Sequence, residues 1–133
     1  MGDRCYLKIT CLKKDADRFK ELGLVEDEER GGTVELSKEE ANYGLWQERE
    51  TLAKAGVVFV GWHSEGGDYA AAAFASDGKT LAEIPTLGND GEPCVALNEK
   101  GKPDAGGMKA FRAYRAAKKR AEAVFGNGAP SPR

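Results

Sequence analysis

The second half of the chain constrains the fold most, because short apolar runs alternate there with residues typical of tight turns. One of these turns is Ser76-Asp77-Gly78-Lys79, and an Asp-Gly pair tolerates the positive φ angles that a hairpin turn needs. Strands that follow one another through tight turns favour a mainly antiparallel sheet. The strands expected in this half are 57–62, 69–75, 80–84 and 94–97.

The first strand and the first helix are predicted from the opening residues. Residues 5–12 alternate with a period of two, which predicts a half-buried strand. Its inner face would carry Cys5, Leu7, Ile9 and Cys11. Asp15 can cap a short helix that ends at Gly23, since glycine is favoured just after a helix.

A charged run, a short strand and a second helix are expected next. Residues 26–30 are all charged and precede two glycines, which predicts a solvated turn. Residues 33–36 have the composition of a short strand. Ser37 and Glu40 have the spacing of a capping box, which predicts a helix that begins there and ends at Gly56.

The closing segment predicts a long amphipathic helix from about Asp104 to Phe125. We therefore expect an α+β protein with two layers, a mainly antiparallel sheet with helices on one face. The expected order is β-α-β-α-β-β-β-β-α. We expect a single domain over residues 1–125 and a flexible C-terminal tail over 126–133.

Composition narrows the class of protein. The chain has 133 residues, which is the size of one ordinary domain. Three cysteines without paired spacing argue against a disulfide framework, and a single histidine argues against a zinc site. No apolar run has the length of a membrane span, and the N-terminus lacks a signal-peptide pattern. We expect a cytoplasmic protein that is not associated with a membrane and binds no metal and no cofactor.

One loop gathers residues that can carry chemistry. Trp62, His63, Glu65 and Asp68 lie together between two expected strands. A histidine beside a carboxylate can act as a general base, because the carboxylate fixes its tautomer. This loop is therefore a candidate small-molecule site or enzyme site. The alternative is a hairpin loop with a half-buried histidine.

Two charged surfaces are candidates for binding a partner. The acidic one is Glu26, Asp27, Glu28 and Glu29, and the basic one is the helix face with Lys109, Arg112, Arg115 and Lys119. Either could instead be a solvated face. Residues 101–133 carry a net charge of +6, yet the whole chain carries −2. That total argues against general nucleic-acid binding, so direct binding through the last helix is kept only as an alternative.

Tyr43, Trp46 and Trp62 are large aromatic residues, and such side chains often anchor an interface. Tyr43 and Trp46 lie off the apolar stripe of the expected second helix, so we expect at least one of them to be exposed. Packing in the core against the sheet is the alternative use.

The stretches GLWQERETLAKAGVVFVGWHSEGGDY and AFASDGKTLAEIP resemble small phage or mobile-element proteins of the anti-CRISPR or anti-defence type. The resemblance covers about residues 40–90 and transfers no functional residue. It implies a small, acidic, non-enzymatic protein that binds and blocks a larger host complex.

The function expected from the sequence is a non-enzymatic protein-interaction module. Such a module would inhibit a host protein or ribonucleoprotein complex that handles nucleic acid. The alternative is a small-molecule-binding protein or an enzyme with its site at the His63 loop.

Overall fold

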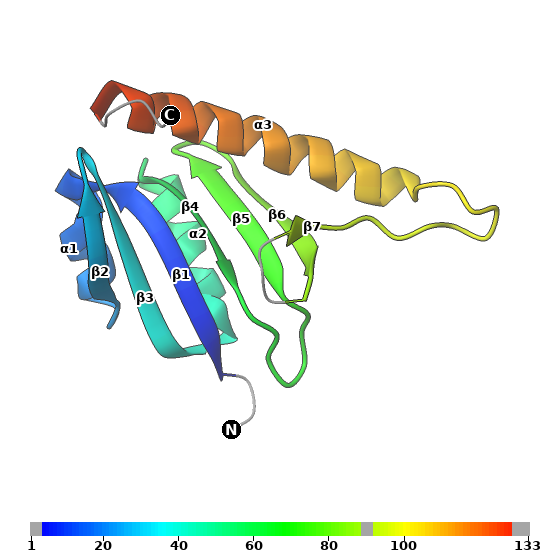
Figure 1. The fold of residues 1–133 in the computed structure, drawn as a ribbon, viewed down its shortest axis with the longest axis horizontal. Coiled ribbons are helices and arrows are strands. Elements are labelled where there is room, and N and C mark those ends of the chain that lie inside the picture. Colours follow the sequence, from blue (N-terminus) through cyan, green and yellow to red (C-terminus); the bar gives the residue numbers. More distant parts are fainter. Residues whose placement is uncertain (1–3, 89–91, 129–133) are drawn as a thin grey trace.

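The computed structural model describes residues 4–88 and 92–128 and contains one seven-stranded antiparallel sheet (Figure 1). The strand order is β2-β3-β1-β4-β5-β6-β7. The strands are β1 Arg4–Leu12, β2 Val25–Arg30, β3 Thr33–Asn42, β4 Val58–His63, β5 Ala72–Asp77, β6 Leu81–Leu87 and β7 Glu92–Pro93. The α-helices are α1 Ala16–Lys20, α2 Trp46–Lys54 and α3 Ala105–Gly128, and short 3₁₀ turns precede α1 and α2.

One face of the sheet packs against α1 and α2 and holds the larger part of the core. The alternation expected in β1 is confirmed, because Cys5, Leu7, Ile9 and Cys11 are all buried. Phe19 of α1 meets Phe59 of β4 edge-to-face, with 5.5 Å between the ring centres. Burying these side chains from both layers supplies most of the driving force for folding.

The opposite face is covered by α3 over β5 and β6. Strand β5 is buried on both faces, and Ala73 and Ala75 allow α3 to approach closely. Tyr114 and Ala117 fill this second core from the helix. The expected helices on one face are therefore divided in the structure, with α1 and α2 on one side and α3 on the other, because β5 is apolar on both of its faces.

The α+β class and the mainly antiparallel sheet are confirmed, and the structure adds a strand. The charged residues expected as a turn form β2, which pairs with β3 from Val25↔Ser37 to Arg30↔Thr33. The residues of the expected capping box also belong to β3, which pairs with β1 as far as Arg4↔Asn42. These backbone hydrogen bonds replace the predicted start of a helix, and α2 begins only at Trp46.

The C-terminal half differs in its details. Strand β6 continues through Pro85 to Leu87, and the strand expected at 94–97 is represented by β7 and a single bridge between Leu97 and Pro103. Helix α3 continues through Gly128, beyond the expected start of the tail, and residues 129–133 lie outside the described part of the chain. No helix among residues 4–88 and 92–128 is long and apolar enough to cross a membrane.

Candidate functional site

A cleft of about 500 Å³ opens on the face of the sheet that carries α2, where that helix begins. We call it the aromatic cleft, and we define it by Tyr43, Trp46, His63, Asp68, Tyr69 and Pro85. Tyr43 and Tyr69 pack with 5.7 Å between their ring centres and form one wall. Trp46 is 47% exposed and Tyr43 is 40% exposed, so both rings offer surface to a ligand.

The backbone at the mouth of the cleft is strained. Tyr43, Gly44 and Leu45 have φ angles of 53°, 61° and 56°, which is the left-handed region. Side chains such as Tyr and Leu rarely adopt it, at a cost of about 1 kcal/mol or more per residue. This run reverses the chain between β3 and α2 and places Tyr43 and Trp46 beside the cleft. A conformation of this kind persists only where the surrounding structure holds it.

Arg49 supplies that support from the floor of the cleft. Its side chain is 2% exposed, and its Nε donates to the Gly44 carbonyl oxygen at 2.8 Å. Its Nη1 donates to Glu83 Oε1 at 3.1 Å, and the guanidinium lies 4.1 Å from the centre of the Phe74 ring. Burial lowers the pKa of Arg49 and the Glu83 carboxylate opposes that shift. The planar fork of arginine suits a site where three partners must be met at once.

His63 ends β4 and is 3% exposed on the floor of the same cleft. Its ring stacks on Phe74 and meets Tyr69 edge-on. Nδ1 lies 2.8 Å from the Ser64 carbonyl oxygen, which can only accept, so Nδ1 carries the proton and Nε2 is an acceptor. Burial lowers the pKa of His63, and the nearby Arg49 adds to the effect, so the imidazole is neutral at pH 7.

The structure separates the residues of the expected His63 loop site. His63 and Asp68 line the aromatic cleft, and Glu65 lies exposed on the loop between them. Trp62 lines a groove on the opposite face of the sheet, because successive residues of a strand point to opposite faces. The hydrogen bond at Nδ1 of His63 is made with a backbone carbonyl rather than with the carboxylate that we expected to orient the ring.

The acidic candidates lie exposed along β2. Glu26 pairs with Lys20 at 3.0 Å, Glu28 with Arg30 at 2.7 Å and Glu29 with Lys13 at 2.8 Å. Asp27 stands at the irregularity in the β2–β3 pairing. Since three of these four carboxylates already face a cation of this chain, the negative potential of the surface is weaker than its sequence indicates.

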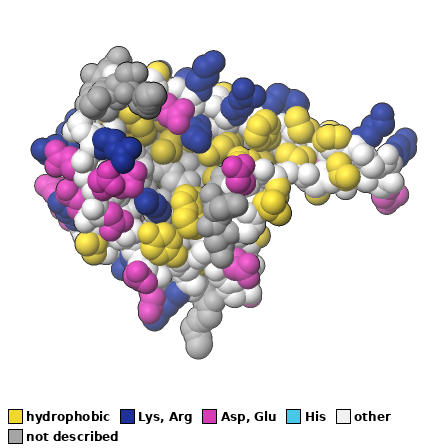
Figure 2. All heavy atoms as spheres, in the orientation of Figure 1, with side chains coloured by type: hydrophobic (Ala, Val, Ile, Leu, Met, Phe, Trp, Pro, Cys, Tyr) yellow, Lys and Arg dark blue, Asp and Glu magenta, His cyan; other side chains and the backbone are white. Residues whose placement is uncertain are grey.

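The basic candidates are brought together on one exposed face of α3, and Figure 2 shows Lys and Arg side chains following this helix. They are Lys109, Arg112, Arg115 and Lys119.

Two charged residues that also line the aromatic cleft, Arg49 and Glu83, were missed in the sequence, and only Arg49 left a clear signal. Arg49 is a cation within the apolar stripe that Leu45 and Leu52 define at helical spacing. Glu83 is a carboxylate with the same strand parity as Leu81 and Pro85. Arg49 is therefore a charge on the inner side of α2, whereas Glu83 stands on the more exposed side of β6 and is 49% exposed. In residues 4–88 and 92–128, no three His, Cys, Asp or Glu side chains form a group that could hold a metal ion.

Comparison with protein-family models, curated proteins and solved structures gives no match for this chain.

Proposed function

We propose that this protein is a protein-interaction module and that the aromatic cleft is its contact surface. The carrying observation is that Tyr43 and Trp46 stand exposed at the mouth of a cleft, on a left-handed backbone that the buried Arg49 supports. Strained backbone is concentrated at functional sites, and Trp and Tyr are enriched among the residues that dominate binding energy. A concave site between two such rings suits one inserted side chain of a partner.

The charges around the cleft favour a basic side chain for that insertion. Asp68 is exposed at the rim, and Glu83 is half exposed although it also pairs with Arg49. A Lys or Arg of the partner can lie over the indole of Trp46 and face Asp68, which combines a cation–π contact with an ion pair. Complexes that handle nucleic acid present basic surfaces. The proposal therefore includes an inhibitor of the anti-CRISPR kind, which binds such a host complex and blocks it.

The proposed compartment is the cytoplasm of the producing or infected cell. Cys5, Cys11 and Cys94 are free thiols, as is usual in a reducing compartment. Burial raises the pKa of the Cys11 thiol to about 12, and Asp15 and Glu26 add to this, so Cys11 stays protonated and unreactive.

A pull-down from lysate of the natural host, with nuclease present, tests the proposal. Tagged wild type, Trp46→Ala and Val25→Ala are compared by mass spectrometry, and the affinity for the captured partner is then measured. Val25 is 65% exposed on β2 and is the matched control for removing an exposed apolar side chain. We expect Trp46→Ala to weaken binding by about tenfold or more and Val25→Ala to leave it unchanged. Equal affinities of all three forms would place the interface elsewhere.

A second candidate function is small-molecule binding in the same cleft, which the buried His63 favours. Its Nε2 is an acceptor in a largely apolar concave site, and such sites bind small ligands. A screen of small cationic and aromatic compounds by thermal shift tests this candidate. Compounds that stabilise wild type should lose their effect in His63→Phe, which keeps a ring but removes the acceptor. If the shifts are the same in both forms, His63 does not contact the ligand.

A further inference from the structure

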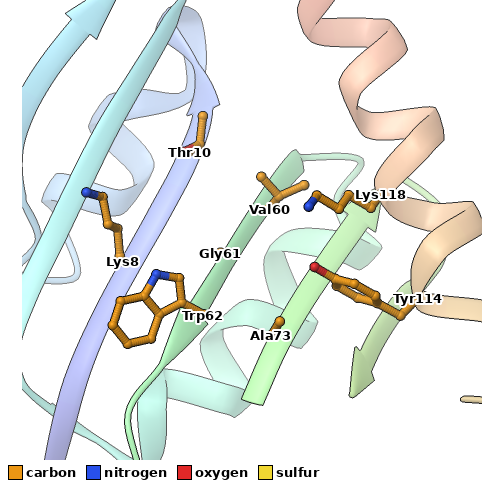
Figure 3. Close-up of a pocket in the computed structure, with 8 residues that line it drawn as sticks. All are labelled: Lys8, Thr10, Val60, Gly61, Trp62, Ala73, Tyr114 and Lys118. Carbon is orange, nitrogen blue, oxygen red and sulfur yellow. The ribbon is translucent and has the colours of Figure 1, made fainter. Parts of the chain in front are cut away.

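A second groove lies on the other face of the sheet, beside α3 (Figure 3). Helix α3 packs mainly on β5 and β6, so the neighbouring surface of β1 and β4 remains accessible. The groove has a volume of about 310 Å³, and residues of β1, β4 and β5 form its floor while α3 forms one wall. It is separated from the aromatic cleft by the thickness of the sheet.

An aromatic platform forms part of this groove. Trp62 and Tyr6 lie on neighbouring strands with 5.6 Å between their ring centres and an angle of 49° between the rings. Both are half-buried, so each ring keeps accessible surface. The hydroxyl of Tyr114 points from α3 toward the floor in Figure 3. An accessible indole beside hydroxyl groups offers a stacking surface for a planar base and donors for its polar edge.

Two lysines flank the platform from different elements. Lys118 extends from α3 toward β4, with its ammonium group 6.0 Å from the centre of the Tyr114 ring. Lys8 extends from β1, and its ammonium lies 3.2 Å from a Glu35 carboxylate oxygen. The hydrogen bond with Glu35 raises the pKa of Lys8, so Lys8 stays charged. The negative charge of Glu35 offsets part of the positive potential that Lys8 adds to the groove.

The helix wall adds positive charge along the groove. Residues 105–128 contain six cations and a single carboxylate, Glu122, so the net charge of this segment is +5. Of these cations, Lys118 lines the groove itself, and Lys109, Arg112, Arg115 and Lys119 lie on the exposed face of α3 and add positive potential at longer range. The floor combines Val60, Gly61, Ala73 and the Trp62 ring with the polar Lys8 and Thr10. This combination complements a ligand with flat bases and a repeating negative charge.

We propose that this groove binds single-stranded nucleic acid, with a base stacked on Trp62 and phosphates beside Lys118 and Lys8. A duplex keeps its bases stacked internally, so the platform requires an unpaired strand. Tyr6 lies next to Trp62, outside the residues that line the groove, and is half-buried. A second base of a strand can therefore lie over Tyr6, which favours a strand over a free nucleotide. This inference does not depend on the proposed function, since it uses the opposite face and other residues.

Tryptophan fluorescence gives the first test, because the chain has two tryptophans, one at each site. In Trp46→Phe the remaining fluorophore is Trp62, and in Trp62→Phe it is Trp46. We expect a short oligodeoxythymidine to quench the emission of Trp46→Phe and to leave the emission of Trp62→Phe unchanged. Quenching of Trp46 alone would move the ligand to the aromatic cleft and overturn the inference.

Anisotropy of a fluorescein-labelled oligodeoxythymidine gives the second test. Each phosphate contact adds about 0.7 to the slope of log affinity against log salt for a single strand. We expect Lys118→Gln to weaken binding several-fold and to reduce the slope by about that amount. Lys54→Gln removes the same charge from the exposed side of α2 and is the control. Glu35→Gln releases Lys8 and should tighten binding.

Three outcomes would overturn the inference. One is no binding at low salt, and another is an equal loss in Lys118→Gln and Lys54→Gln, which indicates attraction by net charge alone. The third is competition by duplex DNA or by thymidine monophosphate as effective as competition by the unlabelled strand, since the occupant would then be a duplex or a free nucleotide.

Discussion

Replacement of Arg49 by alanine should destabilise the protein more than any exposed substitution in α2. The change removes the donor to the Gly44 carbonyl, the donor to Glu83 and the contact with the Phe74 ring. A hydrogen bond from a charged group contributes about 1.5–3 kcal/mol, and a cation–π contact in a buried site contributes about 2 kcal/mol. The loss of these contributions is offset in part, because the folded variant no longer has to bury a charge.

The expected net loss is about 3 kcal/mol, at the lower end for breaking a buried ion pair. It lies at the lower end because Glu83 is 49% exposed and regains water once its partner is gone. Most of the loss should come from the strained residues 43–45, whose carbonyl at Gly44 loses its donor. Glu83→Gln should therefore cost only about 1 kcal/mol, since an amide oxygen still accepts from Nη1.

Urea unfolding followed by circular dichroism measures both variants. A loss of 3 kcal/mol lowers the midpoint by about 1.5 M urea if the slope is about 2 kcal/mol per molar. Arg49→Met is the companion variant, because its side chain fills the site without the hydrogen bonds. A loss below about 1 kcal/mol for Arg49→Ala, or an equal loss for Glu83→Gln, would refute the reasoning that Arg49 chiefly supports the turn.

Three further outcomes are expected. Gly44→Ala should cost about 1–3 kcal/mol in urea unfolding, because φ is 61° and the new Cβ would lie 3.0 Å from His63 Cδ2; an unchanged midpoint would contradict the strain at this position. Folding lowers the pKa of His63, so the unfolded chain takes up the proton first as the pH falls. The free energy of unfolding should therefore fall by up to about 1.4 kcal/mol per pH unit below about pH 6.5. This pH dependence should be absent between pH 7 and 5.5 in His63→Phe. Asp77→Ala should cost about 1–2 kcal/mol at pH 7. Burial alone would raise the pKa of Asp77, but hydrogen bonds from Thr80, Arg120 and Lys79 hold it at about 2. The cost should therefore shrink as the pH falls from about 3.8 through 2 and vanish only below that range; a constant difference across this pH range would exclude this origin.

The sequence predicted those elements whose local pattern and tertiary setting agree. The alternation in β1, the turn at Asp77 and Gly78, and the apolar stripe of α3 each match their positions in the fold. Each combines a strong local preference with one buried face, so no competing arrangement buries the same side chains.

The prediction was wrong where a short motif competed with pairing between distant strands. Ser37 and Glu40 have the spacing of a capping box, but Ser37 pairs with Lys8 in β1 and with Val25 in β2. A strand between two partners gains hydrogen bonds on both sides, and this outweighs the roughly 1 kcal/mol of a cap. Pairing with strands this far away in the sequence cannot be predicted from the pattern of neighbouring residues.

The candidate site was predicted only in part for a similar reason. His63 was identified by its chemistry, but its neighbour Trp62 was assigned to the same site although the two point to opposite faces of β4. Arg49 was missed because its partner Glu83 is 34 residues away in the sequence and meets it only after α2 and β6 are assembled.

The charges of β2 have a consequence for the behaviour of the protein at high concentration. This strand closes one side of the sheet, and all six of its residues are exposed. An open strand offers unpaired amide and carbonyl groups to any second chain that can align with it. Four carboxylates and one guanidinium in succession make that alignment unfavourable, because two copies of β2 would bring like charges into register. At the opposite side, β7 has two residues, which is too short to template further growth. The margin formed by β2 is thus protected against the self-association that leads to aggregation and fibrils.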